Sequence, residues 1–480
     1  MTDLLLEPSA ASKTSPAALA PLPALDVAPL RGDADFAGIK RFVEALAIDP
    51  ALRDLAATDA RAVALACGVD LDPYSFQAVW QRLAGIAEAD FVPPSERALA
   101  YYTTVGHKLG LRQLILDECG HTDPRHARWR RRQIERCYNE IGTTKTEAIV
   151  FAPATFELAD GCSVGCWFCG VGATRLASWW PYDEANAAEW RQTLAGLHDL
   201  MGPGMRWAFC YWATDPLDNP DYERFVCDFH DIVGVFPQTT TAIGQRHLER
   251  TRSLLRASEA RDVPLNRFSV LNVKQMKAIF AAFSAEDLRN VELIPQNTGS
   301  VMRKAVAGKA RDKAEARAAE LVADDGNTIA CVAGFLINMV TRSIRLIAPC
   351  RSTPANPLGY VVIAEDRFAD AAELLAIADE MIGGLPQTVT DLKSLRFVDA
   401  FRFTPTEQGF QLESHYVRRK HEHPVLGAYL RDLGQAVAEG GLTAEEIALM
   451  SFYRFGVPEQ STIAALNGMF DKGVFDETAG

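Results

Sequence analysis

The sequence predicts an α/β protein: a partial (β/α)6 barrel, preceded by a helical region and followed by a small α+β domain. Three observations support this prediction. Apolar residues recur at helical spacing over 36–147, strand-like and helix-like segments alternate over 148–385, and residues 386–480 return to short strands followed by helices. Repeated strand-then-helix units favour a parallel sheet, because parallel neighbours need a crossover connection.

Composition excludes several classes of protein. The chain has 480 residues, with 49 Lys and Arg against 62 Asp and Glu, and its net charge is −13 at pH 7. Contacts to a nucleic-acid backbone come from Lys and Arg, so an acidic chain needs a local basic patch to make them. A hydrophobic content of 48% with 23% charged residues is ordinary for a globular protein. We therefore expect about two to four folded domains and no nucleic-acid partner.

The ten cysteines indicate a reducing compartment. A disulfide framework requires export, and residues 1–35 lack the charged and apolar regions of a signal peptide. Their Ala and Pro content predicts a flexible tail. The longest apolar run, 329–340, contains Asn338 and is shorter than the roughly 20 residues of a membrane span. We expect a cytoplasmic protein with no membrane partner, whose clustered cysteines serve metal or redox chemistry.

The N-terminal helical region spans 36–147. Segments 36–49 and 74–90 place apolar residues three and four positions apart, and strand signals are scarce. The segment 127–142, ARWRRRQIERCYNEIG, predicts a basic helix. Such a helix usually presents a solvated face; the alternative is a surface that docks an acidic peptide or another domain.

The alternating region, 148–385, contains six strand candidates joined mostly by amphipathic segments. After the sixth, residues 343–350 and 358–365 predict a hairpin, because the turn-rich RSTPANP separates them. Six units suit an incomplete barrel. The six strand candidates are 148–158, 205–213, 235–243, 266–273, 290–297 and 328–340.

The last region, 386–480, begins with a β segment at 398–414 that turns near Gly409. Helices follow from about residue 426. One of them starts at LTAEEIALM, where Thr443 can accept from the first-turn amides and Glu446 can reach back, which predicts a capping box.

Cys162, Cys166 and Cys169 form the most informative motif, a CxxxCxxC in the loop after the first expected strand. Thiolates suit iron–sulfur clusters and zinc, and both commonly take four ligands. A [4Fe–4S] cluster held by three cysteines leaves one iron open for a small molecule. A zinc site or three unrelated buried cysteines are the alternatives.

This loop resembles the signature of the radical S-adenosylmethionine (SAM) superfamily. The resemblance implies one [4Fe–4S] cluster on the three cysteines, SAM bound to the open iron by its amino and carboxylate groups, and Phe168 near the adenine. It also implies that Thr214 and Asp215 receive the SAM ammonium, although the family's Gly-Gly-Glu-Pro turn is Ala-Thr-Asp-Pro here. Ser269 is a candidate ribose contact and Gln296 a further cofactor contact. The alternative for each residue is a solvated strand end.

The C-terminal region resembles the PqqD-like winged-helix module that recognises leader peptides during ribosomal peptide maturation. The shared features are the β segment 401–413, a helix that ends near Gly440 and Gly441, and the helix start at Leu442. Such a module binds an extended leader by adding it as a strand to a free sheet edge. A DNA-binding winged helix is the alternative, which the small number of basic residues disfavours.

Together these features resemble the proteusin-type radical SAM peptide epimerases of ribosomal peptide maturation. The resemblance implies a precursor peptide with a leader as partner, an electron donor of the flavodoxin or ferredoxin type, and conversion of L-residues to D. A 5′-deoxyadenosyl radical removes the Cα hydrogen, and a cysteine thiol returns one from the opposite face. Cys350 is the expected donor. Cys331 is the alternative, although its apolar surroundings in sequence suggest core packing.

Two other functions stay open on sequence alone. Radical SAM peptide cross-linking, or another peptide modification, would use the same cofactors without a need for the Cys350 thiol. A non-catalytic protein that binds the precursor is an alternative of another class, which the intact cysteine triplet disfavours.

Overall fold

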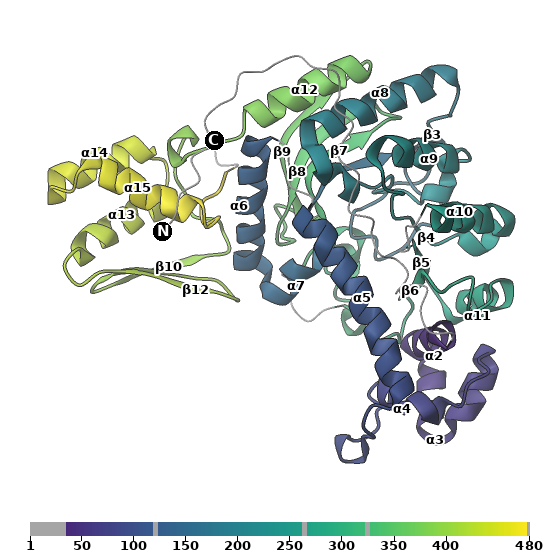
Figure 1. Ribbon diagram of the computed structural model, residues 1–480. Helices are drawn as coiled ribbons and strands as arrows, with labels where there is room; N and C mark the ends of the chain where they lie inside the picture. The colour runs from purple at the N-terminus through teal and green to yellow at the C-terminus, as the bar shows by residue number, and fades with distance from the viewer. Residues whose placement is uncertain (1–34, 119–122, 262–265, 322–326, 478–480) are drawn as a thin grey trace.

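The computed structural model describes residues 35–118, 123–261, 266–321 and 327–477. The expected tail lies outside this part of the chain, apart from Asp35. Helices and sheets are mixed along the described chain (Figure 1), which confirms the α/β class.

The N-terminal region is helical apart from short connections. Asp49 begins its second helix: the carboxylate accepts a hydrogen bond from the Ala51 amide at 2.9 Å, and Pro50 occupies the first position, where a missing N–H is tolerated. That helix ends at Gly68, which has a φ of +67°. The helices are α2 (Phe36–Ile48), α3 (Pro50–Cys67), α4 (Gln77–Trp80), α5 (Glu96–Glu118), α6 (Pro124–Ile141) and α7 (Thr143–Ala148).

The α/β region contains two main sheets. In the first, β1 pairs in parallel with β7, and β7, β8 and β9 follow as antiparallel neighbours. In the second, β4, β5 and β6 are all parallel. The strands are β1 (Ala152–Glu157), β4 (Thr240–Thr241), β5 (Asn266–Val270), β6 (Val291–Pro295), β7 (Val332–Asn338), β8 (Ser343–Pro349) and β9 (Tyr360–Arg367).

The observed strand order differs from that of the expected partial barrel, in which each strand pairs with the strand of the next strand–helix unit. The second expected strand contributes only one bridge, from Phe209 to Thr155, because a 3-10 helix over Gly202–Trp207 occupies its first three residues. The sixth expected strand, β7, pairs with the first and not with the fifth, β6. Among the described residues, no strand pairing therefore joins β6 to β7.

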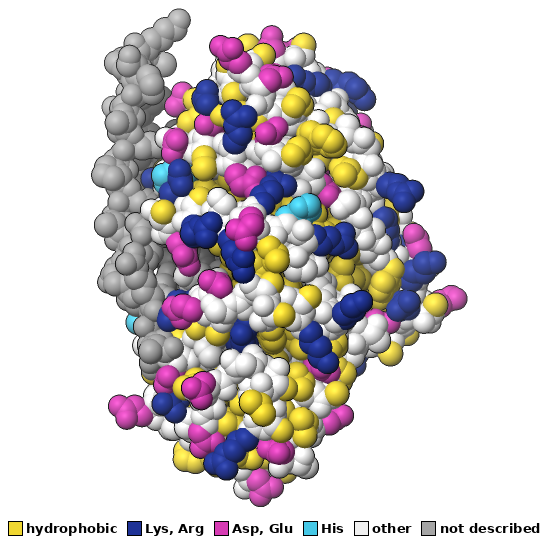
Figure 2. Space-filling model, turned by 90° about the vertical axis from the view of Figure 1, so that its right-hand side faces the viewer, with side chains coloured by type: hydrophobic (Ala, Val, Ile, Leu, Met, Phe, Trp, Pro, Cys, Tyr) yellow, Lys and Arg dark blue, Asp and Glu magenta, His cyan; other side chains and the backbone are white. Residues whose placement is uncertain are grey.

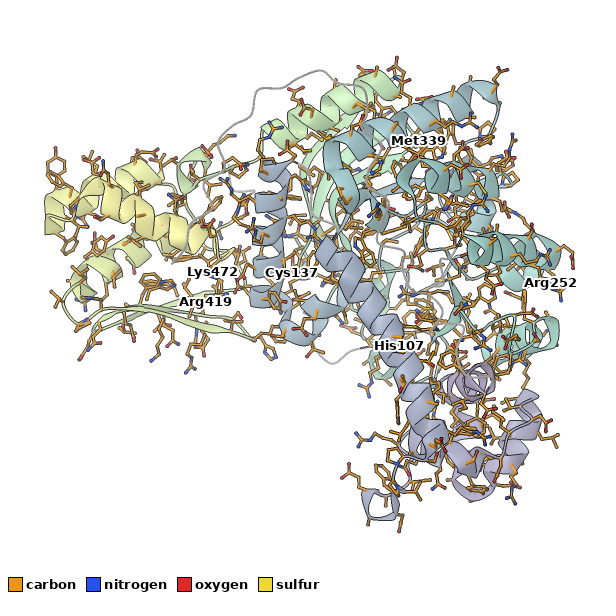
Figure 3. All side chains as sticks on the ribbon, viewed as in Figure 1. His107, Cys137, Arg252, Met339, Arg419 and Lys472 are labelled. Atoms are coloured by element: carbon orange, nitrogen blue, oxygen red, sulfur yellow. The ribbon has the colours of Figure 1, made fainter. Side chains whose placement is uncertain are left out.

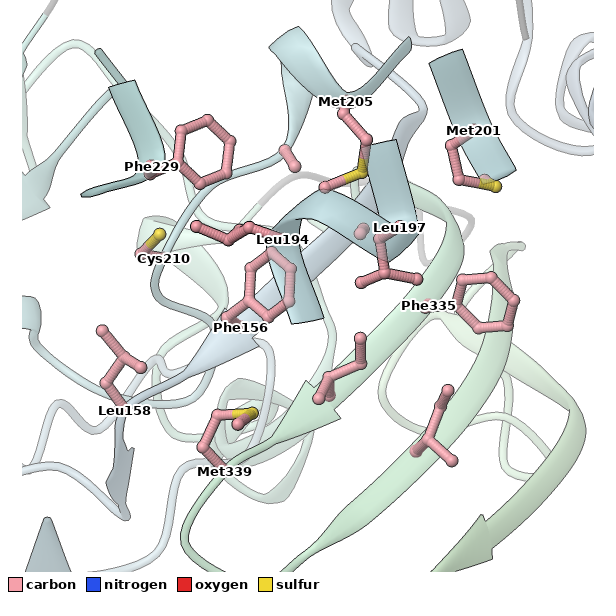
Figure 4. Packing of buried hydrophobic residues seen from close by; sticks show 14 of the residues in the cluster. Phe156, Leu158, Leu194, Leu197, Met201, Met205, Cys210, Phe229, Phe335 and Met339 are labelled. Atoms are coloured by element: carbon pink, nitrogen blue, oxygen red, sulfur yellow. The ribbon is translucent and has the colours of Figure 1, made fainter. Parts of the chain in front are cut away.

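The largest hydrophobic core lies between the first sheet and the helices that cover it. Figure 4 shows Phe156 of β1 packed near Leu194 and Leu197 of the longest covering helix, and Leu158, directly after β1, belongs to the same core. Trp190 is fully buried there, and its indole N–H donates to the Phe225 carbonyl at 3.0 Å. The helices of this region are α8 (Glu184–Met201), α9 (Tyr222–Val233), α10 (Leu248–Ala260), α11 (Val273–Ala282) and α12 (Ala371–Gly383).

A second core joins the N-terminal helices to β5, β6 and α11. Phe42 of α2 is fully buried in it, with ring centroids 5.5 Å from Phe76 and 5.7 Å from Trp80. The helical region is therefore not a free-standing unit, because its apolar face is completed by strands of the α/β region.

α2 also covers the outer edge of β6. Lys40 Nζ donates to the Val291 carbonyl at 2.5 Å, and the Leu293 amide donates to Glu44 Oε1 at 2.8 Å. Lys40 and Glu44 pair with each other at 2.7 Å. These side chains satisfy strand-edge groups that another strand would otherwise pair.

The C-terminal module, residues 386–477, has a core of its own. Three antiparallel strands are followed by three helices, and whether this arrangement is a winged helix stays a prediction. The expected capping box is present: the Glu446 amide donates to Thr443 Oγ1 at 3.1 Å, and the Thr443 amide donates to Glu446 Oε2 at 2.8 Å. The elements are β10 (Arg402–Thr406), β11 (Gly409–Glu413), β12 (Arg418–Glu422), α13 (Gly427–Glu439), α14 (Ala444–Phe455) and α15 (Glu459–Phe470).

The basic helix α6 lies between the α/β region and the C-terminal module (Figures 1 and 3). Arg132 forms an ion pair with Glu477 at 2.9 Å, and the two side chains are 1% and 4% exposed. Arg136 donates to the Pro349 carbonyl at 2.9 Å, at the end of β8. Of the two interpretations of residues 127–142, domain docking therefore describes this helix, and a solvated face does not.

Charges of both signs are interspersed over the face shown in Figure 2. That face offers no single-sign field for a nucleic-acid backbone. Among the helices that the structure describes, none combines the length and the apolar character needed to cross a membrane.

Candidate functional site

A cavity of about 310 Å³ collects the residues predicted to hold the cluster and SAM. Its walls come from the loop after β1, the residues after the 205–213 segment, the carboxyl ends of β4, β5 and β6, and the segment 302–305. Loops at the carboxyl ends of parallel strands lie at one edge of a sheet, which is why residues distant in sequence meet here. All eight predicted residues line the cavity: Cys162, Cys166, Phe168, Cys169, Thr214, Asp215, Ser269 and Gln296.

The cysteine loop is closed at its base by backbone hydrogen bonds. The Cys162 amide donates to the Thr174 carbonyl at 3.0 Å, and the Leu176 amide returns to the Cys162 carbonyl at 3.3 Å. Gly161, with a φ of +82°, precedes the loop, and a Cβ there would lie 2.3 Å from the Arg175 carbonyl oxygen. A side chain at this position would push the two sides of the loop apart.

The donor chemistry of the loop fits an iron–sulfur cluster. Backbone amides donate to two of the sulfurs, from Val164 to Cys162 Sγ at 3.5 Å and from Ala173 to Cys169 Sγ at 3.3 Å, and such bonds tune cluster sulfurs. Burial, followed by the negative charges of Cys169 and Cys162, raises the pKa of the Cys166 thiol to about 12. A bound metal cation would reverse that shift.

Cys162, Cys166 and Cys169 line the same cavity. Across the residues that the structure describes, no three His, Cys, Asp or Glu side chains are arranged to hold a metal ion. The loop therefore supplies three ligands of the expected type, and its arrangement here is not that of a closed coordination shell.

Asp215 is 4% exposed, and both of its carboxylate oxygens accept hydrogen bonds from the protein. Thr241 Oγ1 and the Ala242 amide each donate at 2.7 Å, and the Leu217 amide donates at 3.1 Å. Burial raises the pKa of Asp215 to about 6, against the effect of these donors. The carboxylate thus fixes the end of β4 to the turn after the 205–213 segment, in addition to lining the cavity.

Several residues of the cavity wall were not predicted from the sequence. Tyr211 and Trp212 belong to the second expected strand, and Tyr211 Oη lies 2.8 Å from Thr240 Oγ1. Their place near the end of a strand was the signal that could have identified them. Arg303 and Lys304 also line the cavity, and they follow β6 in a segment without a motif or a periodic pattern.

Cys350, the expected hydrogen donor, lies outside this cavity. It is 3% exposed and lines a separate cavity of about 110 Å³ with Arg136 and Glu140 of α6. Because β8 is antiparallel to β7, the carboxyl end of β8 lies beside the amino ends of β7 and β1. This differs from the expectation that Cys350 faces the barrel mouth. Burial raises the pKa of its thiol to about 12, so the sulfur keeps its proton at neutral pH.

Cys331, the alternative donor, is partly exposed and packs in a cluster that includes Tyr211 and Trp212, which line the cavity. Its carbonyl accepts from the Ala152 amide at 2.8 Å, at the start of β1. Burial raises the pKa of the Cys331 thiol to about 12. Of the two candidate donors, Cys331 has the closer connection to the cavity wall.

Comparisons with known proteins add a relative and a solved structure. No protein-family model matches the chain. The chain is 34% identical to the uncharacterized protein y4wI of Sinorhizobium fredii (strain NBRC 101917 / NGR234) over 453 residues, which cover 92% of this chain and 87% of that protein. The chain belongs to the y4wI family.

The solved structure is described as BtrN in complex with AdoMet and 2-DOIA. It is 13% identical to this chain, with a TM-score of 0.28, and the match covers 40% of this chain and 72% of BtrN. A TM-score of this size does not establish a common fold.

Proposed function

We propose that this protein is a radical SAM enzyme that modifies a ribosomally made precursor peptide. The strongest support is that eight residues, selected from the sequence between 162 and 296 for one cofactor pair, line one cavity. Its volume of about 310 Å³ lies at the lower end of the roughly 300 to 1,000 Å³ that is typical of small-molecule sites. Three thiols on one loop suit a [4Fe–4S] cluster with an open iron.

The residues of the cavity have separate roles in this proposal. When bound, the cluster and SAM would supply a 5′-deoxyadenosyl radical that removes a hydrogen atom from the substrate. The thiolates of Cys162, Cys166 and Cys169 hold the cluster, and Phe168 offers an apolar surface to the adenine. Asp215 orients the wall through its three hydrogen bonds.

The peptide substrate is proposed from the C-terminal module. Its likeness to leader-recognition modules comes from sequence, and its separate core suits a domain that binds a partner of its own. In the described chain, β10 and β12 each leave one edge without a strand partner, and an extended leader can pair with such an edge. An electron donor of the flavodoxin or ferredoxin type completes the proposed set of partners.

The first experiment tests the cofactor. After anaerobic reconstitution we expect about four irons per chain, and 5′-deoxyadenosine on addition of SAM and dithionite. Cys166→Ala should lose both, whereas Cys227→Ala, a matched control on α9 outside the cavity, should keep both. Wild-type protein that binds no cluster, or a Cys166→Ala variant that keeps one, contradicts the proposal. A non-catalytic binding protein would form no 5′-deoxyadenosine.

The second experiment tests the reaction, for which we propose epimerisation. A neutral thiol can return a hydrogen atom to the substrate radical, and burial keeps both Cys331 and Cys350 protonated at neutral pH. The thiyl radical left on the cysteine would regain its hydrogen by taking one electron from the proposed electron donor and one proton from solvent. In D2O, the precursor should gain one deuterium for each residue inverted to D. Cys331→Ala and Cys350→Ala are compared by chiral amino-acid analysis; loss of inversion with continued 5′-deoxyadenosine formation identifies the donor.

One observation favours the second candidate function, peptide cross-linking or another modification. Cys350 lies in a cavity separate from the proposed cofactor residues, and a cross-linking enzyme has no need of its thiol. A product that has lost two hydrogen atoms, with unchanged yield in both cysteine variants, would establish that reaction and exclude epimerisation.

A further inference from the structure

Lys304 is a buried cation without an acidic partner among the residues that the structure describes. Its side chain lines the cavity, and the residue is 6% exposed. Nζ donates to two carbonyl oxygens at long distances, 3.3 Å to Asn297 and 3.5 Å to Met302. Among the described residues, no carboxylate forms an ion pair with it. An ammonium group has three donors, so at least one is free for a ligand.

Burial without a counter-charge is unfavourable for an ammonium group. Burial lowers the pKa of Lys304, and the largest opposing influence is the carboxylate of Glu320. That carboxylate is already engaged, because it accepts from Thr298 at 2.7 Å and from Arg317 at 2.9 Å. A negative group in the cavity would therefore find a cation whose charge is not yet compensated.

The neighbours of Lys304 place it beside the cysteine loop. Its Nζ lies 5.7 Å from the ring centroid of Phe168, the residue before Cys169. Arg303 lines the same wall and is exposed. The carboxylate that lines the cavity, Asp215, is engaged by three donors of the protein. The unpaired charge in this cavity is thus positive.

The position of Lys304 is fixed from the N-terminal helices. Asn297, whose carbonyl accepts from Lys304, donates through Nδ2 to the Ile48 carbonyl at 2.8 Å. The Val301 amide donates to the Ala47 carbonyl at 3.0 Å, and the Lys304 amide donates to the Glu320 carbonyl at 3.0 Å. The end of α2 therefore holds the segment that carries the cation, so little ordering is left to occur on binding.

We propose that Lys304 binds a carboxylate group of the ligand in this cavity. The inference rests on the proposed function, and it adds a residue that no motif assigns. Two sources can supply the carboxylate: the amino-acid end of SAM, or an acidic group of the peptide substrate. Both would make a charge-assisted hydrogen bond with the free donor of Nζ.

The experiment compares dissociation constants for reconstituted wild-type protein, Lys304→Met, Lys304→Arg and Lys277→Met. The ligands are SAM, decarboxylated SAM and the precursor peptide. If SAM supplies the carboxylate, Lys304→Met should weaken SAM binding about tenfold or more and leave decarboxylated SAM unaffected. Lys304→Arg should retain most of the affinity. Lys277→Met, the matched control at an exposed lysine of α11 outside the cavity, should change it little. If the peptide supplies the group, only peptide binding weakens.

Unchanged binding of all three ligands, or equal weakening of SAM and decarboxylated SAM, overturns the proposal. A second arm needs neither cluster nor SAM: acetate, compared with chloride at equal ionic strength, should raise the melting temperature of wild-type protein and not that of Lys304→Met. If acetate raises the melting temperature of wild-type protein but the protein binds no SAM, the proposed function is contradicted and this inference stands. No acetate response, together with normal binding of both SAM and the precursor peptide to Lys304→Met, rejects the inference alone.

Discussion

The N-terminal helices and the C-terminal module join the α/β region in opposite ways. The helices α2 to α4 share one hydrophobic core with β5 and β6, and α2 satisfies the edge of β6 with side chains. The C-terminal module has a complete core of its own and meets α6 through polar contacts such as Arg132 with Glu477. A shared apolar core couples the folding of both sides, whereas a polar junction leaves each side complete.

This difference assigns different roles to the two regions. The N-terminal helices hold the segment 297–304, so they contribute to the shape of the cavity. The C-terminal module is held at a fixed position by α6 without contributing to the cavity wall. We expect changes in the first region to affect ligand binding in the cavity. Changes in the second should affect the attachment and stability of the module, and the leader binding proposed for it, without altering the cavity.

The largest expected effect is that of Phe42→Ala. We expect a loss of about 4 kcal/mol in the free energy of unfolding, as for other buried Phe→Ala changes. Because the core is shared, amide hydrogen exchange should speed up in β5 and β6 as well as in α2. The matched change Phe410→Ala, in the core of the C-terminal module, should leave β5 and β6 protected. Exchange confined to α2 in the Phe42→Ala variant would show that the two parts fold independently.

Arg132→Met should cost about 3 kcal/mol, because Glu477 is left buried without its cation. The effect should fall on the junction: calorimetry should resolve separate transitions for the α/β region and the module. Adding Glu477→Gln should recover part of the loss, since no unpaired charge then remains. A single transition that moves to lower temperature as a whole would mean that the module is not a separate unit.

Asn297→Ala should cost about 2 kcal/mol, because it leaves the buried Ile48 carbonyl without its donor. We also expect weaker SAM binding by equilibrium dialysis, since the segment that carries Lys304 is released. Asn467→Ala is the control: Asn467 accepts from the Val389 amide at 2.9 Å within the C-terminal module. The Asn467→Ala variant should lose similar stability and bind SAM normally. If Asn297→Ala and Asn467→Ala weaken SAM binding equally, the two regions do not differ in their contribution to the cavity.

The smallest effect is expected for Thr443→Ala, which removes the capping box of α14 and should cost about 1 kcal/mol. Hydrogen exchange should rise at the start of α14 and not in α2 or β6. An equal rise of hydrogen exchange in α2 or β6 would contradict the independence of the C-terminal module.

Local patterns in the sequence predicted the individual elements well. In β5 and β6 every second residue is buried, and both strands lie within the segments 266–273 and 290–297 in which they were expected. The segment 205–213 is as apolar as a strand, but a 3-10 helix occupies its first three residues. Which strands pair with each other was not predictable from such local patterns. The pairing of β1 with β7 depends on contacts between residues far apart in sequence, which no local pattern contains.

The same distinction applies to the site. Cysteine spacing identified three residues of the cavity, and the resemblance of their loop to the radical SAM signature supplied the other five. Lys304 carries no such signal, because its significance lies in its burial and in the absence of an acidic partner among the described residues. The location of Cys350 depended on the direction of one strand: the turn between β7 and β8 sends the chain back to the opposite end of the sheet.

Pairing of β1 with β7 delays formation of the cavity during synthesis. Ala152 and Val332 are partners about 180 residues apart, and at roughly 5 to 20 residues per second the ribosome needs about 10 to 40 s to make the second after the first. The cysteine loop emerges early, while Gln296, Lys304 and β7 follow much later. The wall of the cavity can therefore be complete only when the chain is nearly finished.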